Sequence, residues 1–175
     1  MVKKLGMVLL WVFLASTVNA REISESQKFI GVEVSITEVQ GQAGANTSGS
    51  MSEGTGFGLR LGAENEQWRT MFILGFFDDE GRNVEKLLLS IDYFFMKTEV
   101  MDNYALQPYI GVNFGYMNYE SKHIDADGFL YGGQGGIVVD ATEQIGLDLG
   151  YRYSLSSADE LDHTEEVVFG LNYKY

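Results

Sequence analysis

The 175-residue chain contains no cysteine, one proline and two histidines. The absence of cysteine excludes disulfide bonds, thiolate metal sites, iron–sulfur clusters and a cysteine nucleophile. Basic residues are also few: 12 Lys and Arg stand against 25 Asp and Glu, which gives a formal net charge of −13. A chain this acidic repels phosphate groups, so we expect no nucleic-acid partner. With so few histidines and no cysteine, we also expect no metal site and no cofactor.

Glycine and aromatic residues, by contrast, are plentiful. The chain has 21 glycines, 13% aromatic residues and 45% hydrophobic residues. This composition is too apolar for a disordered chain and is typical of β structure with closely packed backbones. The length suits one domain.

The first twenty residues have the three parts of a secretory signal. Lys3 and Lys4 precede an apolar run over residues 5–18, and small or modest side chains follow at residues 18–20. The run is shorter than the ~20 residues that a spanning helix needs. We expect residues 1–20 to be a cleaved signal peptide and residues 21–175 to form the mature domain. An uncleaved N-terminal anchor is the alternative.

Eight segments of the remaining chain alternate between apolar and polar residues with a period of two, as strands with two unlike faces do. They leave no room for a helix of normal length. Longer connections, such as residues 40–53 and 157–164, alternate with short ones, as in outer-membrane barrels; residues 97–103 are a mild exception. The predicted strands cover residues 28–38, 54–64, 67–77, 85–97, 104–119, 128–140, 143–156 and 165–175.

The polar face of these strands carries equal numbers of basic and acidic residues, although the whole chain is strongly acidic. A narrow lumen of low dielectric constant needs such a balance, because each buried charge needs a partner. From this face we predict an ion-pair network in the lumen made by Glu33, Arg60, Asp92, Asp148 and Arg152. The complete set is Arg60, Arg69, Lys86, Arg152 and Lys174 against Glu33, Glu64, Asp92, Asp140 and Asp148.

On the apolar face, aromatic residues gather toward the two ends of the strands, and aliphatic residues fill the middle. A bilayer with two polar interfaces favours this sorting. The pattern predicts an all-β fold, an eight-stranded antiparallel up-and-down transmembrane β-barrel. One predicted girdle is Trp68, Tyr93, Phe95, Tyr104, Tyr173 and Tyr175, and the other is Phe57, Phe76, Phe114, Tyr116, Phe129, Tyr131, Tyr151 and Tyr153.

The last strand has an apolar residue at every second position and ends on an aromatic residue. This pattern, Val167, Phe169, Leu171, Tyr173 and Tyr175, resembles the C-terminal assembly signal of bacterial outer-membrane proteins, although Phe is commoner than Tyr at the last place. With the signal peptide and girdles, the chain resembles the small barrels of the OmpA transmembrane-domain, OmpX and opacity-protein type, a porin family in the loose sense. The resemblance implies an outer-membrane location. It also implies outer-membrane lipid, lipopolysaccharide and the barrel-assembly machinery as partners.

Eight strands enclose an interior just wide enough for side chains, so we expect a plugged lumen. We therefore predict a structural and surface-interaction role without enzymatic activity, with an unidentified extracellular ligand as a further partner. The expected outer loops are acidic and offer carboxylates to divalent cations that could bridge to lipopolysaccharide. Their acidic residues are Asp78, Asp79, Glu80, Glu120, Asp125, Asp127, Asp159, Glu160, Asp162 and Glu165.

Three alternatives stay open. One is transport through a narrow pore, and another is a soluble periplasmic barrel that places its apolar face inside around a ligand. The third is an enzyme that modifies lipid A, for which Ser157, Glu160 and His163 would have to meet. His163 and His123, the two histidines, both fall in expected outer loops.

Overall fold

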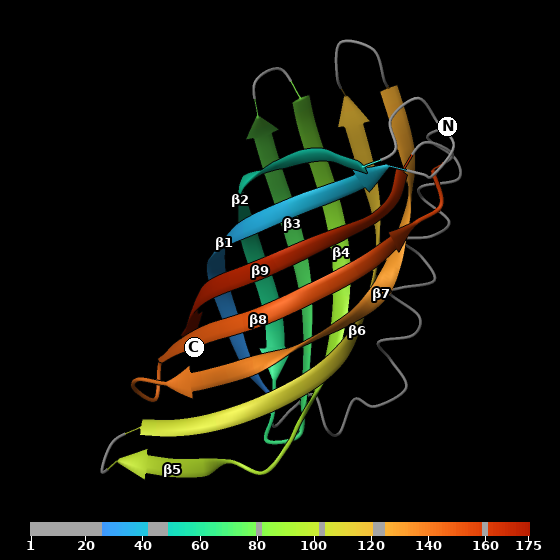
Figure 1. Ribbon diagram of the computed structural model, residues 1–175. Coiled ribbons are helices and arrows are strands. Elements are labelled where there is room, and N and C mark those ends of the chain that lie inside the picture. The colour runs from blue at the N-terminus through green and yellow to red at the C-terminus, as the bar shows by residue number, and fades with distance from the viewer. Residues whose placement is uncertain (1–25, 42–48, 80–81, 102–103, 121–124, 159–160) are drawn as a thin grey trace.

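The computed structural model describes residues 26–41, 49–79, 82–101, 104–120, 125–158 and 161–175, which form β-strands and short turns (Figure 1). The predicted signal peptide, residues 1–20, lies outside these ranges. Within them, no helix is long and apolar enough to cross a membrane. The strands are β1 (Gln27–Gly41), β2 (Gly49–Glu64), β3 (Trp68–Asp79), β4 (Arg82–Phe94), β5 (Thr98–Met101), β6 (Tyr104–Glu120), β7 (Asp125–Asp140), β8 (Ile145–Ser156) and β9 (Leu161–Lys174).

The strands form one antiparallel sheet that closes on itself. Their order is β4-β3-β2-β1-β9-β8-β7-β6-β5, and a further pairing of β4 with β6 completes the ring. Eight strands therefore make the barrel, and the predicted fold class is confirmed. The short β5 pairs only with the lower part of β6 among the described strands, and it extends beyond the barrel (Figure 1). We call the end where β1 ends and β9 begins the upper end, and the opposite end the lower end.

The pairing register tilts the strands around the barrel. A row of paired residues that starts at Leu155 on β8 passes once around the barrel and returns to β8 at Ile145, ten residues earlier in the chain. With eight strands, such a stagger corresponds to a tilt of about 35–45° from the barrel axis. Every residue in this row is apolar: Leu155, Tyr131, Phe114, Leu89, Phe72, Leu61, Ile30, Tyr173 and Ile145.

The alternation places large apolar residues on the outside of the barrel, and the buried side chains inside include both charged and apolar ones. On β1, Ile30 and Val32 point outward and are 50% and 49% exposed, whereas the inward Glu33 is 3% exposed. The same alternation runs along β8 and β9. A soluble barrel with an apolar ligand cavity would have the opposite arrangement.

Several sequence-based boundaries need correction. β4 ends at Phe94 rather than at residue 97, and β8 begins at Ile145 rather than at residue 143. At the upper end the strands are longer than predicted: β1 continues to Gly41, β2 begins at Gly49, β3 continues to Asp79, β4 begins at Arg82, β7 begins at Asp125 and β9 begins at Leu161. The predicted turn 97–103 contains β5. In the longer strands and in β5, main-chain pairing with a neighbouring strand continues past the last residue of the alternating pattern.

Candidate functional site

The lumen can hold long charged side chains because glycines face them on neighbouring strands. A Cβ atom at Gly170 on β9 would overlap the guanidinium of Arg60 on β2. At Gly58, a Cβ would lie 2.7 Å from the Cγ of Glu33 on β1. Inward glycine therefore leaves the space that the charges of the lumen occupy.

In the lower half of the lumen, two arginines share one carboxylate. Asp148 Oδ2 lies 2.8 Å from Nη1 of Arg60 and 2.9 Å from Nη1 of Arg69. Arg69 also contacts Asp92 at 2.8 Å, and its guanidinium lies 4.5 Å from the ring centroid of Tyr109. The Tyr109 hydroxyl donates a hydrogen bond of 2.9 Å to Oδ1 of Asp148, which uses both oxygens of that carboxylate.

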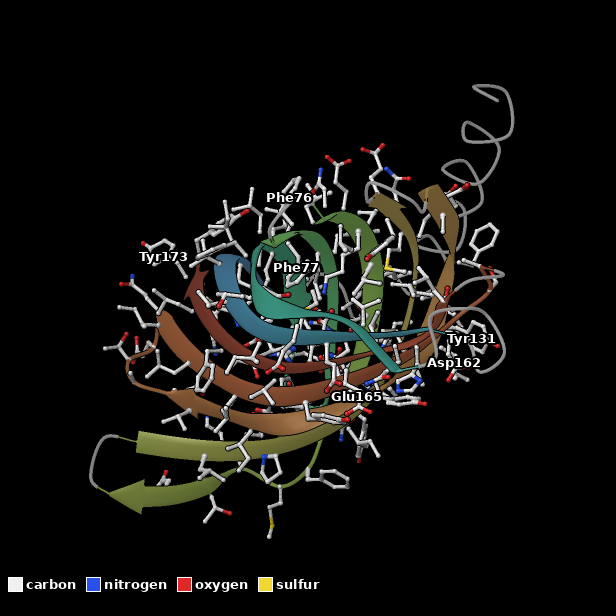
Figure 2. All side chains as sticks on the ribbon, turned by 45° about the horizontal axis from the view of Figure 1, so that its top comes forward. Phe76, Phe77, Tyr131, Asp162, Glu165 and Tyr173 are labelled. Atoms are coloured by element: carbon white, nitrogen blue, oxygen red, sulfur yellow. The ribbon has the colours of Figure 1, made fainter. Side chains whose placement is uncertain are left out.

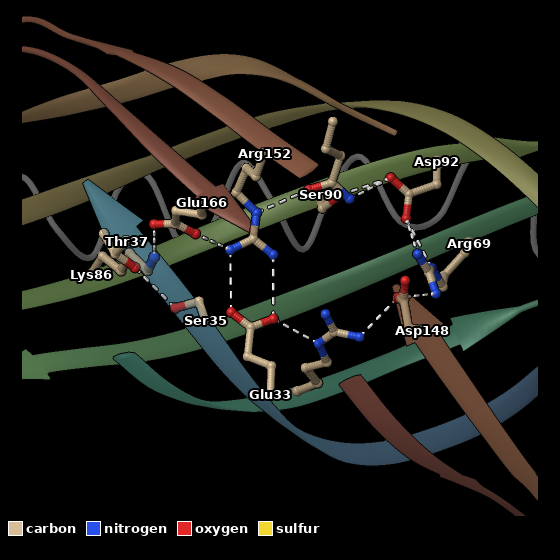
Figure 3. Close-up of polar contacts among 12 residues, drawn as sticks. Glu33, Ser35, Thr37, Arg69, Lys86, Ser90, Asp92, Asp148, Arg152 and Glu166 are labelled. Atoms are coloured by element: carbon tan, nitrogen blue, oxygen red, sulfur yellow. Dashed lines mark hydrogen bonds and ion pairs between the residues drawn. The ribbon is translucent and has the colours of Figure 1, made fainter. Parts of the chain in front are cut away.

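The network continues upward through Glu33. Its Oε2 accepts a hydrogen bond of 2.7 Å from Nε of Arg60, and its Oε1 lies 3.2 Å from Nη1 of Arg152 (Figure 3). Arg152 Nη1 then contacts Glu166 at 2.7 Å, and Glu166 forms an ion pair with Lys86. Four basic and four acidic side chains thus form one continuous neutral network.

The five residues that the sequence predicted for this network, Glu33, Arg60, Asp92, Asp148 and Arg152, all belong to it. Arg69 and Lys86, which were placed on the polar face but not in the core set, join them. Sequence reasoning missed Glu166. Glu166 lies on the same inward-facing side of β9 as Val168 and Gly170, and this alternation could have identified it.

The other three charges of the predicted polar face lie apart, at the lower end. Lys174 Nζ is 2.6 Å from Glu64 and 2.7 Å from Asp140. Asp140 also contacts Lys97 at 2.6 Å, although half of the Lys97 side chain is exposed. This small cluster ties the last residue of β9 to β2 and β7, and is again balanced in charge.

The upper end of the lumen is apolar, which the sequence reasoning did not predict. Nine inward side chains, here called the apolar plug, are each 8% exposed or less. They were overlooked because large apolar residues were assigned only to the outward face. The apolar plug consists of Val39, Phe77, Val84, Met117, Tyr119, Ala126, Leu130, Ala158 and Leu161.

The outer surface carries the predicted aromatic groups. At the lower end, the rings of Trp68 and Tyr93 meet edge to face with centroids 5.0 Å apart, and Phe95 continues the row at 5.8 Å. At the upper end, Tyr116 and Phe129 pack at 5.6 Å. Tyr173 lies at the lower end and Tyr131 toward the upper end (Figure 2). The side chain of Tyr104 lies outside the described residues.

Several acidic residues expected in loops lie instead at the upper ends of strands. The described carboxylates of Glu120, Asp127 and Asp162 are exposed there. Glu165 is paired in register with Glu38, which is paired with Glu53, so that three acidic residues lie side by side on the outer surface. Asp78, Asp79 and Asp125 also lie within strands. Glu80, Asp159 and Glu160 lie outside the described residues.

The hypothetical triad of Ser157, Glu160 and His163 is not assembled from its described members. Ser157 Oγ accepts a hydrogen bond of 2.8 Å from the main-chain N–H of Phe129. His163 lies in β9 rather than in a loop, and its ring stacks on Tyr153 with centroids 4.9 Å apart. Its two nitrogens contact Asp162 at 2.8 Å and Glu165 at 3.3 Å. Glu160 and His123 lie outside the described residues.

The part of the chain that the structure describes contains no cluster of potential metal ligands. There, no group of three or more His, Asp or Glu side chains is arranged to hold a metal ion. The charged side chains of the described lumen neutralise one another through their ion pairs.

No protein-family model and no curated protein sequence matches the chain. Solved structures do match. Neisserial surface protein A has a TM-score of 0.65 and 13% identity, over 85% of this chain and 97% of the other. Outer membrane protein H from P. aeruginosa has a TM-score of 0.60 and 21% sequence identity, and the match covers 85% of this chain and 99% of the other. The N-terminal β-barrel domain of Pseudomonas aeruginosa OprF has a TM-score of 0.53 and 14% sequence identity, and the match covers 83% of this chain and 97% of the other. The chain therefore has the fold of small outer-membrane β-barrels.

Proposed function

We propose that the protein is an integral outer-membrane β-barrel with a structural and surface-interaction role. The observation that carries the proposal is the inverted polarity of the barrel. Its outward side chains are large and apolar, for example Phe129 at 65%, Phe57 at 62% and Ile110 at 58% exposure. Soluble monomers rarely expose contiguous apolar patches larger than a few hundred Å². An outer surface of apolar side chains around a barrel matches the hydrocarbon region of a lipid bilayer.

The same polarity argues against the soluble alternative, and the contacts of Ser157 and His163 bear on the enzyme alternative. A soluble periplasmic carrier needs an apolar ligand cavity, whereas this lumen is filled by ion pairs and by the apolar plug. The lipid A-modifying alternative needs a serine in contact with a base, whereas the hydroxyl of Ser157 bonds the main chain of Phe129 and the ring of His163 contacts Asp162 and Glu165. We therefore propose a non-enzymatic role.

Orientation follows from the proposed export route. A signal peptide over residues 1–20 would deliver the chain to the periplasm, so the lower end, where β1 begins and β9 ends, would face the periplasm. The upper end would then face the cell exterior and present its acidic residues to partners. Lipopolysaccharide phosphates near Glu38, Glu53 and Glu165 would need divalent cations between them and these carboxylates.

Fractionation of cells that express the full chain tests the proposal. We expect the protein in the outer-membrane fraction, where the unboiled folded form migrates differently in a denaturing gel from the boiled form. Recovery in the soluble periplasm after gentle lysis would contradict the proposal. The surface role is tested by shortening residues 42–48: the barrel should still insert, while cell adhesion or envelope integrity should change. Unchanged adhesion and integrity would leave only a membrane-packing role.

A further inference from the structure

The lumen contains two regions of different chemistry, one above the other, and an apolar strip of Phe29, Met71, Ile73 and Leu88 continues from the upper region down beside the lower one. The lower region is the neutral network that runs from Asp92 to Lys86. The upper region is the apolar plug. The register places them in direct succession, because Lys86 on β4 pairs with Met117 on β6, and Glu166 lies two residues along β9 from Thr164, which pairs with Val39. A solute that crossed the lumen would have to pass both regions.

A small chamber lies where the two regions meet. Its volume is about 10 Å³, close to the space for one water molecule. Glu33, Lys86 and Glu166 of the network line it on one side, and Val39, Phe77 and Met117 of the apolar plug line it on the other. The hydroxyls of Ser35 and Thr37, which are 2.9 Å apart and hydrogen-bonded, also face it.

We infer that the network and the apolar plug are two independent seals in series, with the chamber closed off between them. The network blocks ions because its basic and acidic side chains are already paired and, with buried neighbours such as Met71, Ile73 and Leu88, occupy the lower lumen. The apolar plug blocks them differently, because an ion would lose its hydration shell among side chains of which only Tyr119 carries a polar group. Either region is therefore sufficient to keep the lumen closed. This inference rests on the proposed membrane-spanning function.

Conductance of three variants in planar bilayers tests the inference. The network variant Glu33→Gln/Arg152→Gln removes one charge of each sign, so the lumen stays neutral. The plug variant carries Phe77→Ser, Met117→Ser and Leu161→Ser. We expect neither variant to conduct and the combined variant to show stable current steps. Steps from the network variant alone, or from the plug variant alone, would show that the other region is no seal and overturn the inference. A silent combined variant would also overturn it, because a third barrier would then exist.

A second phenylalanine on β3 provides the matched control. Phe77 points into the lumen and is 4% exposed (Figure 2), whereas Phe72 points outward, is 42% exposed and does not line the chamber. Phe72→Ser introduces the same chemistry on the lipid side. Added to the network variant in place of the three plug substitutions, it should produce no current steps. Steps from that combination would indicate general loosening of the barrel and would overturn the assignment of the seal to the apolar plug.

The cysteine-free chain allows a second test. Thr37→Cys places a single thiol in the chamber, and Ser157→Cys places one at an exposed position beyond β8. A water-soluble thiol reagent should modify Ser157→Cys at once and Thr37→Cys only after either seal is opened. Rapid modification of Thr37→Cys in the unaltered barrel would overturn the inference. Heat-dependent gel migration of every variant shows that it is folded and inserted, so failure of the membrane proposal is recognised separately.

Discussion

At the residue scale, Asp148 joins two arginines and a tyrosine in the lower part of the lumen. It accepts hydrogen bonds from Arg60, Arg69 and Tyr109. Asp148→Asn would leave the two guanidinium groups facing a neutral amide inside the barrel. Breaking a buried ion pair by removing one partner costs about 3–5 kcal/mol. We expect a loss of this size in the free energy of unfolding, measured by denaturant titration in detergent micelles. Glu143→Gln, at an exposed turn position, is the control and should change it by less than about 0.5 kcal/mol.

The space around two glycines, Gly170 and Gly133, allows a second prediction. A Cβ at Gly170 would overlap Arg60, whereas a Cβ at Gly133 would meet nothing nearer than 3.6 Å, the main-chain oxygen of Gly111. Gly170→Ala should therefore destabilise the barrel by about 1–3 kcal/mol, as overpacking of a filled interior does. Gly133→Ala should be neutral or slightly stabilising. Equal losses for both variants in the same titration would contradict the packing argument.

At the scale of the element, β9 combines two tasks. Phe169 points outward from it and is 54% exposed, in the middle of the apolar belt. Phe169→Asp would turn a charge toward lipid, where a base at the midplane costs ~2–4 kcal/mol and an acid somewhat less. We expect the variant to be missing from the outer membrane, as we do for deletion of Tyr175, which removes the end of the predicted assembly signal. Phe169→Leu should insert normally. Normal membrane levels of the first two variants would argue against the assembly signal.

The strands also show what the sequence could and could not reveal. Period-two alternation located all eight barrel strands, because each has one lipid-facing and one lumen-facing side. It could not locate their upper ends. Around Gly49 and Leu161 the strands continue through main-chain pairing, and no alternation marks that. The four residues of β5 are too few for a periodic signal.

Inside the barrel, the sequence revealed charges but not partners. The balance of charge on one face indicated an ion-pair network, and its five core residues do meet. Which arginine contacts which carboxylate depends on the stagger of the strands, which has no local sequence signal. The apolar plug was overlooked for a related reason. Phe77 and Met117 lie in the inward phase, but two apolar neighbours in succession, as at Phe76 and Phe77, hide the phase.

At the scale of the whole molecule, the proposed orientation predicts which turns reach the cell surface. Ser157 and Thr142 lie beyond opposite ends of β8, and both are exposed. Each can be replaced by a single cysteine in this cysteine-free chain. On intact cells, a membrane-impermeant thiol reagent should modify Ser157→Cys and spare Thr142→Cys until the cells are broken. The reverse pattern would invert the orientation.

The closure of the barrel by the pairing of β4 with β6 has a consequence for its lifetime. Each of the eight barrel strands is hydrogen-bonded along both sides, so none can leave without breaking two ladders and opening two edges toward lipid. The first step of unfolding therefore has a high free-energy barrier. The lifetime of the folded barrel is then set by its unfolding rate and not by its equilibrium stability. A barrel once inserted should persist through many cell divisions and be lost mainly by dilution into daughter cells.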